Sequence, residues 1–173
     1  DPGRDWDLVN AIEDGRAACE AHRWGDAWRL LASVVGGGRD VDDLHRLATA
    51  AYLTGHDEDG FSLWTRAYEL CVSAGAIHRA GHLSLKLCQG LGFKGDLPRF
   101  RGWIERSARL LEDADIDCVE RGYLEYGLGF LSVFEAGDIA GAHGRFVQAG
   151  KIGARFNHRE LVTLARIGEG RML

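Results

Sequence analysis

The sequence has little proline and no apolar run long enough to cross a membrane. It contains only two prolines in 173 residues, and Pro98 follows the dipeptide Gly95-Asp96. Proline is tolerated at that place, in the first turn of a helix. No apolar stretch approaches the roughly 20 residues that a bilayer requires, and the N-terminus lacks the basic and then apolar order of a signal peptide. We therefore expect a cytoplasmic protein that makes no membrane contact.

Paired cysteines and an excess of positive charge are also lacking. Cys19, Cys71, Cys88 and Cys118 are widely spaced, form no Cys-x-x-Cys pair and have small or apolar neighbours. Such residues are typical of reduced cysteines in a core. The formal net charge is −5, with acidic and basic residues interspersed. This pattern provides no basic field for nucleic acid, so we expect no direct nucleic-acid binding by this segment.

Sequence motifs for catalysis are missing as well. His78 and His82 lie four residues apart, the spacing of two imidazoles that share a metal on one helix face. No third carboxylate or thiol accompanies them in the same segment, so we interpret them as a solvated or groove-lining pair. The other histidines come with no Gly-x-Ser-x-Gly or His-Glu-x-x-His motif. We expect no enzyme activity, no cofactor and no metal, and keep a metal enzyme built on the histidine pair as a remote alternative.

The sequence does contain a repeated spacing. A small residue five positions after a turn glycine is followed by a bulky one and another small one, as in Gly55, Gly60, Trp64 and Ala67, and again in Gly137, Ala142, Phe146 and Ala149. This is the spacing of stacked antiparallel helix pairs. Apolar residues at three- and four-residue intervals dominate elsewhere. The sequence therefore predicts an all-α, tetratricopeptide-like α-solenoid of about four and a half antiparallel helix pairs, in a single domain over residues 1–173.

Turn and capping residues set the expected helix boundaries. We place left-handed turns at Gly25, Gly55, Gly95 and Gly137, and side-chain caps at Asp57, Asp96 and Asp138. We expect the three glycines at 36–38 to form a flexible joint before a capped, acidic helix start. The predicted helices span residues 6–23, 25–35, 41–54, 57–74, 76–94, 97–113, 116–136, 139–155 and 159–171.

Two features of the repeats each allow two interpretations. Ala18, Ala48 and Cys88 occupy the position seven before a turn glycine, where paired helices approach closely, but Phe130 occupies it in the fourth pair. We expect that pair to be splayed or shifted in register. Many glycines also lie inside the predicted helices. They indicate either close helix packing or a compliant superhelix that closes on a ligand.

A groove is the candidate functional site, because the first helix of each pair lines the concave surface of such repeats. The candidate residues on those helices are Asp42, His45, Thr49, Tyr52, His82, Gln89, Phe93, Leu131 and Phe134. Arg79, His82, Lys86 and Gln89 form a polar stripe that faces the groove in this register. A mixed aromatic and polar groove suits an extended peptide or a small amphipathic ligand. The alternative is that Tyr52, Phe93 and Phe134 pack between repeats.

The chain also resembles a known family in several segments. They include Trp24-Gly25-Asp26-Ala27-Trp28, residues 43–55 (Asp43-Leu44-His45-Arg46 onward), Trp64-Thr65-Arg66-Ala67, Gly102-Trp103-Ile104-Glu105-Arg106 and Ile152-Gly153-Ala154-Arg155-Phe156. Together they resemble the helical repeats of large actinobacterial LuxR-type transcriptional regulators. The resemblance implies a sensor and interaction array that is usually joined to a C-terminal helix-turn-helix. DNA binding and ATP use do not transfer to this segment, which we expect to be a fragment of a larger regulator.

The expected function is that of a non-enzymatic binding or sensing module. A peptide, protein or small-molecule ligand would occupy the concave groove and favour one superhelical curvature, which changes the activity of a neighbouring module. The alternative is a structural scaffold that self-associates through its end repeats, as a homodimer for example. Sedimentation at several protein concentrations distinguishes the two hypotheses.

Overall fold

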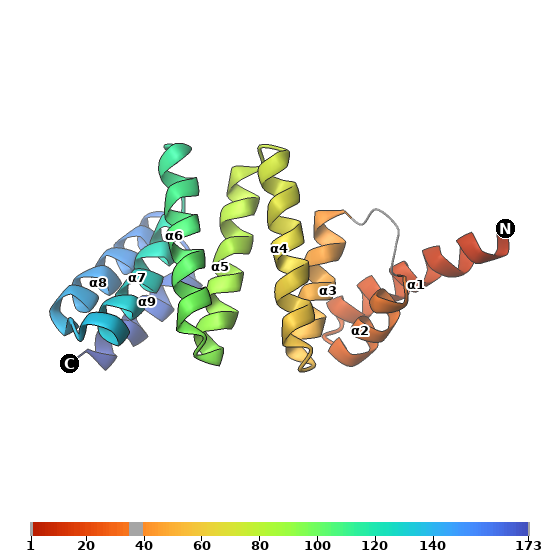
Figure 1. Ribbon diagram of the computed structural model, residues 1–173, viewed down its shortest axis with the longest axis horizontal. Helices are drawn as coiled ribbons and strands as arrows, with labels where there is room; N and C mark the ends of the chain where they lie inside the picture. Colours follow the sequence, from red (N-terminus) through yellow and green to blue (C-terminus); the bar gives the residue numbers. More distant parts are fainter. Residues whose placement is uncertain (1, 35–39, 173) are drawn as a thin grey trace. The chain divides into compact units, whose positions relative to one another are not determined.

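The computed structural model describes residues 2–34 and 40–172, with side chains from residue 9 onward in those ranges. Within them the chain is all-α and contains no strand, as predicted. The helices are α1 (Pro2–Glu20), α2 (Trp24–Ser33), α3 (Val41–Leu53), α4 (Asp57–Ser73), α5 (Ile77–Lys94), α6 (Leu97–Asp113), α7 (Glu120–Ala136), α8 (Ile139–Arg155) and α9 (Arg159–Arg171) (Figure 1). The predicted glycine joint at 36–38 lies outside the described residues.

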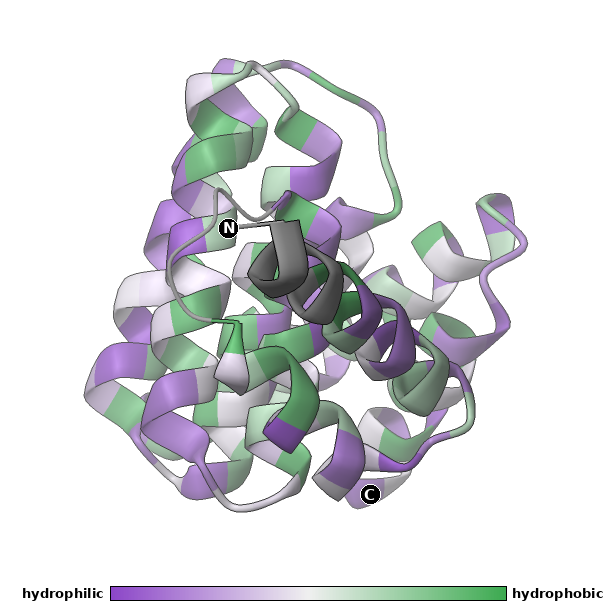
Figure 2. Cartoon of the chain, turned by 90° about the vertical axis from the view of Figure 1, so that its right-hand side faces the viewer, coloured by the Kyte–Doolittle hydropathy of each residue, from purple (hydrophilic) through white to green (hydrophobic). Residues whose placement is uncertain are grey.

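The helices form two compact units, Asp1–Gly75 and Ala76–Leu173. In the first, α1 packs on α2 and α3 packs on α4, while α2 also contacts α3. In the second, α5 pairs with α6, α7 pairs with α8, and α9 packs on α8. Each coloured helix in Figure 2 carries both hydrophobic and hydrophilic residues, as expected for helices with one buried face. No helix in the described ranges is long and apolar enough to cross a bilayer.

Three of the four predicted turn glycines have the left-handed conformation. The φ angles are 85° at Gly55, 72° at Gly95 and 62° at Gly137. The prediction for Gly25 is wrong, because Gly25 is the second residue of α2. The left-handed residue at that turn is His22, with a φ of 54°. Gly75, which was not predicted as a turn residue, also has a positive φ of 70°.

Side-chain caps begin four of the described helices, and at α9 the cap is His158, whose Nδ1 accepts from the Leu161 amide at 3.4 Å. Asp40, Asp96 and Asp138 each accept a hydrogen bond from the backbone amide three residues later. The cap predicted at Asp57 is wrong, because Asp57 is already the first residue of α4 and His56 precedes the helix without a side-chain cap. Asp57 still lies in the first turn, where a negative charge complements the helix dipole.

The start of α7 differs from the prediction by four residues, since the helix begins at Glu120 and not at 116. Asp115 has a φ of 47°, so the chain leaves α6 through a left-handed residue. Residues 114–119 then form the connection between α6 and α7. This connection brings Cys118 into the core, where it is 3% exposed.

The predicted close contacts between paired helices are present. Ala18, Ala48 and Cys88 are buried. A Cβ atom on Gly60 would lie 3.0 Å from the Ala48 carbonyl oxygen, so α3 and α4 meet there without an intervening side chain. Phe146, which the repeat pattern marks as a bulky contact residue, is fully buried. Burial of a side chain of that size contributes roughly 1.5–3 kcal/mol.

The fourth pair is shifted in register, one of the two outcomes expected from Phe130. The small residue at the contact between α7 and α8 is Gly129, where a Cβ atom would lie 2.7 Å from the Phe146 ring. Phe130 lies beside this contact and packs edge-on against Phe146, with ring centroids 5.4 Å apart. The shift places Phe130 on the wall of a cavity described below.

The helical glycines support the close-packing interpretation at several positions. A Cβ atom on Gly122, Gly127 or Gly168 would lie 2.7 Å or less from a side chain of another helix. Gly102 and Gly144 are different, since nothing lies within 4 Å of a Cβ atom placed there. Close helix approach therefore accounts for the first group and not for the second.

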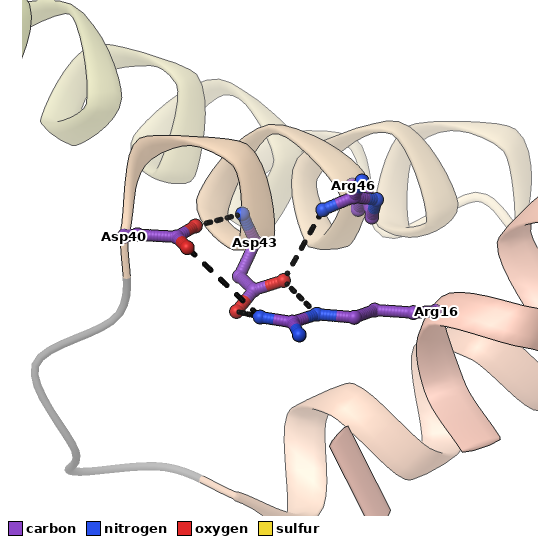
Figure 3. A network of polar contacts seen from close by, with 4 residues as sticks. All are labelled: Arg16, Asp40, Asp43 and Arg46. Carbon is purple, nitrogen blue, oxygen red and sulfur yellow. Dashed lines mark hydrogen bonds and ion pairs between the residues drawn. The ribbon is translucent and has the colours of Figure 1, made fainter. Parts of the chain in front are cut away.

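An ion-pair network fixes α1 to α3 in the first unit (Figure 3). Arg16 Nε donates to Asp43 Oδ1 at 2.8 Å, and Arg16 Nη2 donates to Asp43 Oδ2 at 2.6 Å. Arg46 adds a third contact to Oδ1 at 3.4 Å. The two parallel hydrogen bonds from Arg16 are the strong, directional form of an arginine–carboxylate pair.

Candidate binding groove

A cavity of about 490 Å³ opens in the second unit between α5, α7 and α9. These are the first helices of successive pairs, the ones expected to line a concave surface. Its lining also includes Phe100 and Ile104 of α6, which are 5% and 1% exposed. We call this cavity the α5/α7/α9 groove.

Large apolar side chains lie uncovered in the groove. Phe93 at the end of α5 is 77% exposed, Phe134 at the end of α7 is 59% exposed, and Ile167 of α9 is 52% exposed. Phe134 stacks on Phe130 with ring planes 14° apart. The alternative of packing between repeats therefore does not describe Phe93 and Phe134, most of whose surface faces solvent.

Two glycines lie among the residues that line the groove. A Cβ atom on Gly127 would lie 2.3 Å from Ile104 Cδ1, so α7 comes close to α6 only because this side chain is missing. On α5, a Cβ atom on Gly92 would lie 3.5 Å from the Phe100 ring. Cys88 also borders the groove, and burial raises the pKa of its thiol to about 12. At neutral pH this thiol is protonated and unreactive.

The polar residues differ between the two ends of the groove. Glu120 and Glu160 lie in the first turns of α7 and α9, whereas Arg171 is the last residue of α9. Since α5, α7 and α9 are alternate helices of an antiparallel stack, their first turns meet at one end. The acidic pair therefore lies at one end of the groove, and Arg171, with Phe93 and Phe134, lies at the other.

The polar stripe of α5 borders the middle of the groove through His82, Lys86 and Gln89, while Arg79 does not line it. Partial removal of His82 from water lowers its pKa, and the nearby charge of Lys86 lowers it further. The imidazole is therefore mostly neutral at pH 7, and the positive charge on this wall comes from Lys86.

Tyr123 is held in place at the acidic end. Its ring meets His158 edge-on, with centroids 5.6 Å apart. Burial, followed by the charge of Glu160, raises the pKa of Tyr123 above its ordinary value. The tyrosine stays a neutral donor and supports the wall of the groove.

Four of the nine candidate residues line this groove, namely His82, Gln89, Phe93 and Phe134. Leu131 does not. It is 9% exposed and packs in the core, to one side of the groove-lining stripe of α7.

The other four candidates belong to the first unit and line neither cavity described here. His45 Nδ1 accepts a hydrogen bond from Trp64 Nε1 at 3.1 Å. The Thr49 hydroxyl donates to the His45 carbonyl at 2.8 Å. Tyr52 is half-buried against Trp64 with centroids 5.6 Å apart, so it packs within its own helix pair and neither in a groove nor between repeats. Asp42 is exposed on α3.

Sequence reasoning missed several groove residues, and one signal could have found most of them. Tyr123, Tyr126, Phe130 and Phe134 all line the groove and recur at three- and four-residue intervals along α7. This aromatic stripe is visible in the sequence. The contribution of α9 through Ile167 and Arg171 has no such signal, because no pattern within α9 says which helices it packs against.

A second cavity, of about 590 Å³, lies on α6, α7 and α8 and has a charged lining. Its arginines already have partners. Arg145 Nη1 donates to Glu125 at 3.0 Å, Arg155 pairs with Asp117, and Arg121 Nη2 donates to the Leu111 carbonyl at 2.8 Å. These contacts fasten helices together, so this cavity is a weaker candidate for a binding site.

Comparison with known proteins identifies the fold. No protein-family model and no curated protein sequence matches the chain. A solved structure of MamA MSR-1 C2 is similar over 96% of this chain and 98% of that chain, with a TM-score of 0.56 and 17% sequence identity. The fold is tetratricopeptide-like. A mutant of MamA is similar over 98% of this chain and 99% of that chain, with a TM-score of 0.49 and 18% identity.

The first likeness establishes an all-α, tetratricopeptide-like α-solenoid as the fold class, and the low identity limits it to the fold. Folds of this class typically serve as protein-interaction or scaffold modules.

Proposed function

We propose that the chain is a non-enzymatic binding module that holds an extended peptide segment of a partner protein in the α5/α7/α9 groove. The observation that carries this proposal is the uncovered pair Phe93 and Phe134, 77% and 59% exposed at one end of a cavity with an apolar floor. A volume of about 490 Å³ lies within the usual range for ligand pockets. It accommodates a few side chains and not a whole domain.

The charges of the groove indicate the chemistry of the peptide. Its apolar side chain would pack on Phe93 and Phe134, and a carboxylate beside it would meet Arg171. A basic or hydroxyl group would face Glu160 at the other end. This polarity gives the bound peptide one direction, because the reversed peptide would place its carboxylate next to Glu160.

Binding is favoured over catalysis by the state of the groove's own groups. Burial raises the pKa of the Cys88 thiol, and burial beside the charge of Glu160 raises the pKa of the Tyr123 hydroxyl, so both groups stay protonated at neutral pH. Neither is activated as a nucleophile. What the groove offers is apolar surface with a polar margin, the composition of a recognition site.

A selected peptide tests the proposal. The full chain, free of any tag, is used to select binders from a random peptide library displayed on phage, and the dissociation constant of one synthetic binder is measured by fluorescence anisotropy. We expect Phe93→Ala and Phe134→Ala each to weaken binding by at least about 10-fold, since exposed aromatics in a groove are the usual hot spots.

Phe156→Ala is the matched control. Phe156 is an exposed phenylalanine of the same unit, 38% exposed, and lines neither cavity. We expect its affinity to stay within about 2-fold of the unmutated chain, with unchanged circular dichroism for all three variants. Equal affinities for the three variants, or no peptide enriched above an unrelated protein, would show that the groove does not bind peptides.

The wider context of the module remains the one that the sequence resemblance suggests. We propose that it belongs to a LuxR-type regulator and reports occupancy of the groove to a neighbouring domain by a shift between two conformations. The neighbouring coding sequence is the test. A helix-turn-helix encoded in frame downstream supports this context, and a stop codon directly after Leu173 counts against it.

Self-association through the end helices is the second candidate function. Val9 of α1 is 49% exposed and Ile167 of α9 is 52% exposed, so both helices present apolar surface. Sedimentation velocity from micromolar to hundreds of micromolar protein distinguishes the candidates. A constant monomer mass is expected for the binding module. A mass that rises with concentration, and falls again in Val9→Asp, would establish the scaffold.

A further inference from the structure

Three groups of different chemistry converge at the first turn of α5. Within the described residues, one ligand atom each from His78, Cys118 and Glu120 lies within 4.8 Å of the others. His78 is the second residue of α5, Cys118 lies in the connection after α6, and Glu120 begins α7. The sequence alone pairs His78 with His82, but the fold places a thiol and a carboxylate next to it.

Glu120 carries an independent sign that a partner is missing. Its side chain is only 12% exposed, and its Oε2 atom is buried without a hydrogen-bond partner. The nearest group able to carry a positive charge is the His78 imidazole, whose Nδ1 lies 3.8 Å away. A buried carboxylate oxygen without a partner is costly, so a cation at this point would remove a real penalty.

The identity of the donors selects the cation. An imidazole nitrogen, a thiolate sulfur and a carboxylate oxygen are all ligands that zinc accepts. Calcium and magnesium bind almost only oxygen, so a thiol and an imidazole disfavour them. Three protein ligands leave a fourth position of a tetrahedral zinc site open to water.

The geometry requires only a small adjustment. Zinc–ligand bonds of about 2.0–2.3 Å place the ligand atoms of a tetrahedral site roughly 3.3–3.7 Å apart. The widest separation in the cluster, up to 4.8 Å, must therefore shorten by about 1 Å. His78 can make this movement, because its side chain is 63% exposed in the first turn of its helix. Cys118 is 3% exposed and the Glu120 side chain is 12% exposed, so these two residues would serve as the fixed part of the site.

Gly81 supports the position of Glu120. Glu120 Cγ lies 3.4 Å from the point where a Cβ atom on Gly81 would be, so the glutamate side chain lies directly over α5. This brings the carboxylate to the side of α5 on which His78 lies, one turn earlier. We propose that His78, Cys118 and Glu120 bind one Zn²⁺ ion and thereby tie the start of α5 to the α6–α7 connection.

The experiment measures zinc binding by the full, tag-free chain after treatment with a chelator. Isothermal titration with Zn²⁺ gives stoichiometry and affinity, and titration with Co²⁺ reports a thiolate ligand through a sulfur-to-cobalt charge-transfer absorption. We expect one metal ion per chain, a charge-transfer band, and a melting temperature that rises when zinc is added. These readouts need no peptide, so they do not depend on the proposed function.

Variants locate the ion. We expect His78→Ala and Glu120→Gln each to weaken zinc binding by at least about 100-fold, since even residues outside the ligand shell cost 10–100-fold. Cys118→Ser should in addition abolish the charge-transfer band. His78→Ala keeps the test valid should Cys118→Ser fail to fold, because His78 is exposed. His82→Ala is the control on the same helix and should keep full affinity.

Three results would overturn the proposal. The first is the absence of stoichiometric zinc binding by the unmutated chain. The second is unchanged zinc affinity in His78→Ala. The third is a loss of affinity in His82→Ala equal to that in His78→Ala, which would assign the ion to the histidine pair.

Discussion

Asp43 occupies an unusual position for a charged residue, since its side chain is only 9% exposed. Its partners Arg16 and Arg46 are 40% and 37% exposed, so water partly screens the pair. The sequence predicts an acidic helix start at Asp40–Asp43, and Asp40 is indeed the cap. It does not predict that Asp43 faces inward to Arg16, because those residues are 27 positions apart and no local pattern links them.

We expect Asp43→Asn to destabilise the chain by about 1–2 kcal/mol, at the low end of the range for charged hydrogen bonds because the arginines are screened. The amide keeps the size of the carboxylate but offers only one acceptor atom to Arg16. Urea unfolding at pH 7 measures the change. Asp42→Asn, at an exposed site on the same helix turn, is the control and should change stability by less than about 0.5 kcal/mol.

The same ion pair predicts a dependence on pH. The hydrogen bonds from Arg16 hold the pKa of Asp43 below its ordinary value of 3.8. Between 3.8 and the lower pKa of Asp43 in the folded chain, the unfolded chain binds more protons than the folded chain. Stability therefore falls as pH falls through this range. The stability gap between the unmutated chain and Asp43→Asn should be complete above about pH 5 and shrink below pH 4. A gap of constant size down to pH 3 would contradict the ion pair.

At the scale of helices, local signals locate the ends and long-range contacts decide the rest. Gly95 and Gly137 end helices, and Asp96 and Asp138 begin them, as their residue types predict. These signals act within a few residues of chain. The packing of α9 beside α7, which completes the groove, involves residues more than 20 positions apart and leaves no local signature.

A pair of glycine substitutions tests whether close approach explains the helical glycines. A Cβ atom on Gly129 would lie 2.7 Å from the buried Phe146 ring, which Gly168 confines at the same distance from α9. We expect Gly129→Ala to destabilise the chain by about 1–3 kcal/mol through overpacking.

Gly144→Ala is the matched substitution on the facing helix. It is exposed and has nothing within 4 Å of the added methyl group, so it should stabilise the chain by about 0.5–1 kcal/mol. Thermal unfolding measures both. Stabilisation by both substitutions would mean that the glycines serve compliance and not packing.

At the scale of the whole molecule, the repeat pattern predicts the fold class but only part of the site. It leads to His82, Gln89, Phe93 and Phe134, because first helices of successive pairs share a surface. It fails for His45 and Tyr52, whose contacts with Trp64 lie within their own helix pair. The cluster of His78 with Cys118 and Glu120 was invisible for a related reason, since 40 residues separate the histidine from the thiol.

The central claim is that the α5/α7/α9 groove holds a peptide on Phe93 and Phe134. The most direct measurement labels the seven phenylalanine rings with an NMR-active isotope and follows their resonances during titration with the selected peptide. We predict that the resonances of Phe93 and Phe134 shift together and saturate with the measured affinity, while those of Phe61 and Phe156 stay in place. Saturable binding that leaves the Phe93 and Phe134 resonances unmoved would contradict the account.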